Sequence, residues 1–313
     1  MTRTTTQTRA QPARPGTARA TPPRRPWTRD RVETLVLKIL RWVVIAGFLV
    51  AILFPFYYMV LLSLRTIQQF LLDPGNLSFI HQVSARSYGT VLKPVSHGGQ
   101  GFLIFLRNSG LIAILTVVVT LVVSIPGAYA VGRLRFFGHR QVSFLFLAVY
   151  LFPSILLAIP LFAFFTRLGL RGSLFALIIV YISQTVPVSI YMMRNYFETI
   201  PPSLEEAAMV DGCSRFSVIW RISLPLAKPA IMATGLYIFM IAWNEYLFAL
   251  LFLVEDRGHW TVSLGLALLS GSVEIPTTVL MAGSVILTVP IIVLFFFTER
   301  LLTEGLTSGA EKG

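Results

Sequence analysis

Six apolar blocks, each long enough to cross a membrane, constrain this chain more than any other feature. They contain 20 to 24 residues each and occupy 42–64, 109–131, 142–165, 174–193, 231–253 and 277–298. A helix of about 20 apolar residues spans the hydrocarbon core of a bilayer. Only one side chain in the six blocks, that of Glu245, carries a formal charge. We therefore expect an all-α integral membrane protein with six transmembrane helices.

Other structures fit these blocks poorly. An amphipathic surface helix would have a polar face, and a transmembrane β-barrel would alternate apolar and polar residues; the blocks have neither pattern. Charged residues make up 13% of the chain, whereas a soluble domain has about 25%.

Basic residues predict the orientation of the spans. With the N-terminus inside, the inner segments carry 19 Lys and Arg residues and the outer segments carry 7. An excess of basic residues marks the cytoplasmic side. We expect both termini in the cytoplasm, with the chain in the cytoplasmic membrane and in contact with its lipids.

The N-terminal segment has its own composition. Residues 1–29 contain seven Arg and no acidic residue among Thr, Pro, Ala and Gln, which is typical of disorder. We expect a disordered basic cytoplasmic tail at 1–41, a membrane domain at 42–298 and a cytoplasmic C-terminal tail at 299–313. A basic tail can bind nucleic acid, but the span that follows favours a role in topology and lipid contact, and an organelle transit peptide remains open.

The chain has no recognisable catalytic chemistry. It contains one cysteine, Cys213, and four histidines that are scattered without metal-ligand spacing. No phosphate-binding loop or hydrolase motif is present. We predict no catalytic residues, no metal site and no cofactor in this chain.

One inner loop, 203–225, has the pattern of a folded element. Ser203 and Glu206 have the spacing of a capping box, and Gly212 is expected to adopt the left-handed conformation that ends a helix. Ser214 is a candidate N-cap of a second short helix, which Pro225 is expected to end. The loop is thus predicted to be a helix, a glycine turn and a second helix.

This loop resembles the "EAA" loop of ABC importer permeases, with the spacing of that family. The matching positions are Glu206, Ala207, Ala208, Gly212, Ile222, Leu224 and Pro225. The resemblance implies that the first helix docks into a cleft of a separate ATPase subunit. Small residues at Ala207 and Ala208 fit such close approach, and an ordinary interfacial helical hairpin is the alternative.

Further matches, which include Asn108-Ser109 and Thr261 to Leu266, resemble the carbohydrate branch of these permeases, the six-span maltose type. The resemblance implies a permease subunit of an ATP-driven importer for a sugar or oligosaccharide. It also implies a second permease in a heterodimer, two ATPase subunits that use ATP and magnesium, and an extracellular sugar-binding protein. No nucleic-acid partner is expected.

Two further groups of residues are candidates for function. A lone carboxyl within a span is costly unless it faces protein or water, so we place Trp243, Asn244 and Glu245 at the substrate pathway or a subunit interface. In resembling permeases the outer loop 254–276 faces the binding protein. This resemblance makes Glu255, Asp256, Arg257 and Trp260 candidate contacts with that partner.

Three alternatives remain open at this point. A secondary transporter would need several intramembrane ionisable groups, of which only Glu245 is present. A membrane enzyme would need clustered His, Asp or Glu residues near a span end. An ABC permease for another solute, such as glycerol phosphate or an oligopeptide, differs only in its cargo.

Overall fold

The computed structural model describes residues 29–77 and 83–310, and all regular secondary structure in these ranges is helical. The chain divides into two units, Met1–Pro55 and Phe56–Gly313. The long helix α1 (Arg29–Ser63) runs through that boundary. Residues 29–41, which we expected to belong to the disordered tail, are helical, so that part of the prediction is wrong. Residues 1–28 lie outside the described range.

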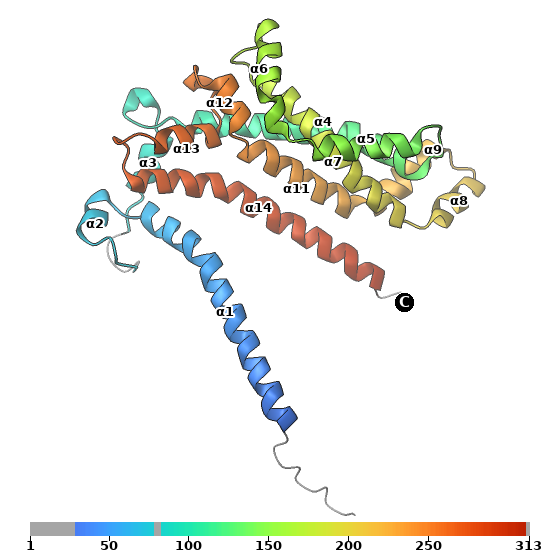
Figure 1. The fold of residues 1–313 in the computed structure, drawn as a ribbon, viewed down its shortest axis with the longest axis horizontal. Coiled ribbons are helices and arrows are strands. Elements are labelled where there is room, and N and C mark those ends of the chain that lie inside the picture. Colours follow the sequence, from blue (N-terminus) through green and yellow to red (C-terminus); the bar gives the residue numbers. More distant parts are fainter. Residues whose placement is uncertain (1–28, 78–82, 311–313) are drawn as a thin grey trace, which may run out of the picture. The chain divides into compact units, whose positions relative to one another are not determined.

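The long helices of the second unit are α4 (Phe102–Arg133), α7 (Leu174–Thr199), α11 (Lys228–Asn244) and α14 (Thr277–Ala310). Helices α4 and α7 form the most extensive pair, and α11 packs against α4, α7 and α14 (Figure 1). Helix α14 continues to Ala310, so most of the expected C-terminal tail is helical.

Shorter helices connect these elements. Before α4 lie α2 (Ile67–Leu72), α3 (Arg86–Leu92) and a 3-10 turn, Val95–His97; between α4 and α7 lie α5 (His139–Leu151), the 3-10 turn Ser154–Leu157 and α6 (Ala158–Arg167). The inner loop contains α8 (Pro202–Val210), α9 (Arg215–Val218), a π-helical turn Ile219–Ser223 and α10 (Leu224–Leu226). Between α11 and α14 lie α12 (Leu247–Leu253), the 3-10 turn Arg257–His259 and α13 (Val262–Ser270).

Four described helices are individually long and apolar enough to cross a membrane, namely α1, α4, α7 and α14. Two bent pairs bring the number to six if each counts as one span. One pair, His139–Leu151 with Ser154–Arg167, bends by 83°, and the other, Arg215–Leu226 with Lys228–Asn244, bends by 73°. The first bend breaks the third expected span, 142–165, whereas the second bend lies before the fifth expected span, 231–253. The fifth breaks at Glu245 and continues as α12.

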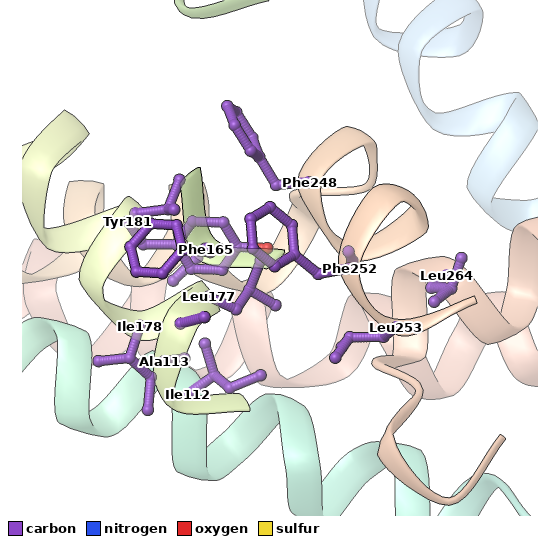
Figure 2. Close-up of a cluster of buried hydrophobic side chains, with 14 of the residues drawn as sticks. Ile112, Ala113, Phe165, Leu177, Ile178, Tyr181, Phe248, Phe252, Leu253 and Leu264 are labelled. Atoms are coloured by element: carbon purple, nitrogen blue, oxygen red, sulfur yellow. The ribbon is translucent and has the colours of Figure 1, made fainter. Parts of the chain in front are cut away.

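The core of the second unit lies where α4, α6, α7, α12 and α13 meet (Figure 2). Ile112 of α4, Leu177 and Tyr181 of α7, and Phe248 and Phe252 of α12 are almost completely buried there. Smaller apolar clusters lie toward the two ends of α4, one around Phe102 and Phe105 and one around Tyr129 and Phe197. Helices α8 and α9 lie at one end of this unit and α3 and α13 lie at the other (Figure 1).

Candidate functional site

The first helix of the inner loop, α8, begins at Pro202, and its N-cap residue Pro201 makes no side-chain cap. The capping box expected from Ser203 and Glu206 is therefore wrong, because both residues already lie inside the helix. Proline at the start of a helix costs little since the first N–H groups have no intrahelical partner. Glu206 is exposed and is free for a different role.

The neighbouring glutamate, Glu205, anchors α8 to the rest of the chain. Its carboxylate accepts hydrogen bonds from the Tyr129 hydroxyl at 3.1 Å and the Ser223 hydroxyl at 2.9 Å. The Nε atom of Arg133 lies 3.4 Å from Glu205 Oε1, and Arg133 also donates to the carbonyl oxygen of Ile200. Glu205 is 8% exposed. A buried carboxylate with these partners fixes the position of α8 against the end of α4.

Sequence reasoning missed Glu205. The adjacent Glu206 matched the family pattern, and nothing local distinguishes two neighbouring glutamates. The available signal was Arg133 with Tyr129 at the end of the second apolar block, a basic and an aromatic residue that need a polar partner near the membrane surface.

The remaining residues of the pattern divide between an exposed and a packed face of α8. Ala207 is exposed and Ala208 is buried, while the apolar side chains of Leu204 and Val210 are also exposed. Val210 is 87% exposed. The outward face of α8 therefore combines a small residue with uncovered apolar side chains.

Gly212 adopts the conformation expected of it. Its φ is +88°, and no atom lies within 4 Å of the position that a Cβ would take. Glycine is favoured here because of the backbone conformation, and not because a larger side chain would lack space. The amide N–H of the next residue, Cys213, bonds to the carbonyl oxygen of Ala208 and closes the turn.

The second part of the loop begins as predicted and ends later. The Ser214 hydroxyl accepts a hydrogen bond from the backbone N–H of Ser217 at 3.3 Å, which confirms the N-cap. The helical segment ends at Leu226, one residue after the expected stop at Pro225, and the 73° bend into α11 follows.

The residues of this second part are exposed to different degrees. Ile222 and Leu224 are half-buried and Pro225 is exposed. Phe216 and Trp220 are more than half exposed and border an apolar groove that α4 and α11 complete.

A hollow of about 1,220 Å³ lies beside α8. It is lined by the end of α4, the 134–139 segment, Glu205, Glu206 and Arg215. The structure thus brings the exposed Glu206 to the rim of a concave surface that is formed by two separate loops.

Glu245 lies at the break between α11 and α12. Its Oε1 accepts the backbone N–H of Phe248 at 2.8 Å, its Oε2 accepts that of Ala249 at 3.1 Å, and the buried Tyr181 hydroxyl also donates to Oε2. The carboxylate therefore caps α12 and ties it to α7, which explains a charge within an apolar block.

The two residues before Glu245 differ in their surroundings. Trp243 is buried, stacks on Phe239 and donates from its indole N–H to the carbonyl oxygen of Leu287 on α14. Asn244 is exposed, and its amide bonds to the carbonyl oxygen of Met240 in the preceding turn. Of the three predicted residues, Asn244 is the most exposed and Glu245 is half-buried. A pathway or interface role for the group stays a prediction.

The predicted outer contact residues fall into two pairs. Glu255 and Asp256 are exposed; Glu255 forms an ion pair with Arg171, and Asp256 caps the following turn. Arg257 and Trp260 are half-buried and stack on each other.

Arg257 and Trp260 also join the outer loop to the start of α4. Arg257 bonds to the carbonyl oxygen of Gln100, and the Asn108 amide donates to the carbonyl oxygen of Trp260 at 3.0 Å. Arg257 and Trp260 hold the loop in place, and Glu255 and Asp256 are the accessible members of the predicted set.

Comparison with known proteins agrees with this architecture. Residues 124–303 match the family described as the binding-protein-dependent transport system inner membrane component. The inner membrane ABC transporter permease protein YcjP of Escherichia coli strain K12 is 37% identical over 270 residues, which cover 86% of this chain and 94% of that protein. The trehalose/maltose transport system permease protein MalG of Thermococcus litoralis is 37% identical over 285 residues, which cover 90% of this chain and 99% of that protein.

A solved structure supports the fold independently. A chain of a bacterial ABC transporter involved in the import of the acidic polysaccharide alginate has a TM-score of 0.74 and 24% identity, with 86% of this chain and 97% of that chain covered. The helical membrane architecture and the expected resemblance are thus confirmed. This chain belongs to the family of inner membrane components of binding-protein-dependent transport systems, and it is a multi-pass membrane permease subunit and not an enzyme.

Proposed function

We propose that this permease moves a sugar or oligosaccharide into the cell, driven by ATP hydrolysis in a separate subunit. One observation supports the coupling role. The buried Glu205 holds α8 against α4, while Glu206 and Ala207 on the same helix remain exposed. A helix that transmits force must be rigidly joined to the membrane helices and must also offer a free surface. The sugar is supported by the trehalose/maltose relative.

The partners follow from the surfaces that remain exposed. We place the ATPase against α8 and Gly212, with contacts from Glu206, Ala207 and Val210. Two ATPase subunits, loaded with ATP and magnesium, would serve this chain and a second permease of similar fold. An extracellular sugar-binding protein would meet the outer loop at Glu255 and Asp256. Both termini would then lie in the cytoplasm.

Reconstitution tests the proposal. The chain is purified with its companion permease, ATPase and binding protein, placed in proteoliposomes, and assayed for ATP-dependent uptake of labelled maltose and trehalose. We expect uptake of at least one of these sugars that requires both ATP and the binding protein. Uptake of glycerol 3-phosphate or an oligopeptide in place of a sugar would assign the chain to another cargo, and uptake without the ATPase would remove the importer mechanism.

A further inference from the structure

A half-open cavity lies between helices of the apolar segments of this subunit, where apolar packing is the rule. Its volume is about 500 Å³, within the range of about 300–1,000 Å³ that is typical of small-molecule sites. It is lined by α5, α6, α7 and α11. None of the residues described around it is an Asp, Glu, Lys, Arg or His.

Gln184 on α7 is the distinctive residue of this cavity. Its amide Nε2 is buried and has no hydrogen-bond partner among the described residues. The neighbours of Gln184 are satisfied, because Ser183 donates to the carbonyl oxygen of Val180 at 2.7 Å and Thr185 lies 2.9 Å from the Thr120 hydroxyl. A buried donor without a partner destabilises the protein. Since lipid cannot supply an acceptor either, the amide is suited to a ligand.

The backbone around the cavity offers further polar groups. Pro187 lacks an N–H and therefore cannot bond to the carbonyl oxygen of Ser183 one turn earlier. The break between α5 and α6, at Phe152 and Pro153, also borders the cavity. Broken helices are tolerated at membrane depth only where protein or a water-filled cavity satisfies their backbone groups, and transporters use such breaks at substrate sites.

The side chains around Gln184 define the chemistry of the ligand. Tyr150 and Tyr237 contribute hydroxyl groups together with ring faces, and Phe152 and Ile241 contribute apolar surface. Hydroxyl and amide groups exchange hydrogen bonds with sugar hydroxyls, and ring faces cover the C–H faces of a sugar ring. A carboxylate, sulfonate or phosphate would find no cationic side chain among the lining residues.

We infer that this cavity receives one uncharged ring of the transported sugar, and that the Gln184 amide donates a hydrogen bond to one of its hydroxyls. The inference rests on the proposed function. It means that side chains of this subunit contact the transported sugar directly.

Thiol accessibility in the assembled transporter tests whether water and sugar reach the cavity. In a Cys213→Ser background, a Gln184→Cys variant is compared with an Ile179→Cys variant, because Ile179 is exposed on the same helix and does not line the cavity. We expect a water-soluble methanethiosulfonate to label Gln184→Cys at least about tenfold faster, since the reaction needs a hydrated thiolate. We also expect maltose or trehalose, whichever is transported, to slow that labelling. Equal rates for the two variants would overturn the inference.

Uptake by conservative variants tests the hydrogen bond itself. Gln184→Leu removes the unpartnered donor and replaces it with an apolar side chain of similar volume, so the transporter should still assemble. Uptake at low sugar concentration should fall about threefold to tenfold. Gln184→Asn keeps the amide and should lose less. Normal uptake by Gln184→Leu in a complex whose wild type transports sugar would overturn this inference alone. A wild-type complex that transports neither sugar would instead overturn the proposed function, and the ligand class with it.

Discussion

Glu205 on α8 and Arg133 in the last turn of α4 face each other across 3.4 Å, with both side chains about nine-tenths buried. They are 72 residues apart in the sequence, and they join the loop proposed for coupling to a helix that crosses the membrane. The Tyr129 and Ser223 hydroxyls complete the group by bonding to the same carboxylate. We expect any movement of α8 to be transmitted to α4 through this compact polar cluster.

Removal of the Glu205 carboxylate should break this connection. Glu205→Ala leaves Arg133 buried without its counter-charge, a change that typically costs about 3–5 kcal/mol. We expect lower yields of the assembled complex and loss of sugar-stimulated ATP hydrolysis. Glu206→Ala is the matched control because that neighbour is exposed, and it should leave the thermal stability unchanged. Equal stability of the two variants, measured by the melting temperature in detergent, would contradict the anchoring role.

The turn at Gly212 should tolerate residues according to their backbone preference. Valine at φ +88° is strained, and a left-handed conformation costs an ordinary residue about 1–2 kcal/mol. Gly212→Val should therefore reduce both ATPase association and transport. Gly212→Asn is the control, since asparagine visits this region readily and the site has room for a side chain. If both variants fail equally, the requirement at Gly212 is for small size and not for conformation.

The sequence predicted helices well and helix breaks poorly. Long apolar blocks must be helical in lipid, whatever they pack against. Proline alone does not indicate where a span breaks, because Pro126, Pro187 and Pro290 lie within continuous helices, whereas the chain bends at Pro153. The break at Glu245 depends on the Tyr181 hydroxyl, which is 64 residues away. Such breaks are set by tertiary contacts.

In the candidate site, too, local features could be predicted from the sequence and tertiary contacts could not. The glycine turn at Gly212 and the cap at Ser214 are local features, and both were predictable. The roles of Glu205 and Glu206 depend on which face of α8 meets Arg133, and one sequence contains no information on that contact. The cavity at Gln184 was also missed, because a single glutamine within an apolar block gives no local pattern.

Glu245 should matter for structure as well as for transport. Glu245→Leu removes the acceptor for two backbone N–H groups of α12 and leaves the Tyr181 hydroxyl buried without a partner, a loss of about 1–3 kcal/mol for such a group. We expect reduced assembly with the second permease, and a smaller effect for Glu245→Gln, which keeps one acceptor. Adding Tyr181→Phe to Glu245→Leu should restore part of the stability, since no unpaired hydroxyl remains. Normal assembly and transport in all three variants would exclude both the capping role and the pathway role.

The topology can be tested with single cysteines. Ser270 is exposed at the end of α13, and Ser308 lies near the end of α14. In a Cys213→Ser background, we expect a membrane-impermeant maleimide to label Ser270→Cys in intact cells and Ser308→Cys only after permeabilisation. Labelling of both sites under the same condition would place them on one side and contradict the proposed orientation.

Bulk at Ala207 should separate this subunit from the ATPase without disturbing its own fold. Ala207 is exposed while Ala208 is packed, so a large residue at Ala208 would also damage the permease itself. In Ala207→Trp an indole ring takes the place of a methyl group at the proposed contact, where overpacking by about 1–3 kcal/mol lowers affinity about fivefold or more. We expect weaker co-purification of the ATPase and a parallel fall in transport, with normal membrane insertion and normal sugar binding by the binding protein. Ala207→Ser keeps the small size and should behave like the wild type. Wild-type ATPase association in Ala207→Trp would show that α8 does not face the ATPase, and the coupling role proposed for this loop would have to be abandoned.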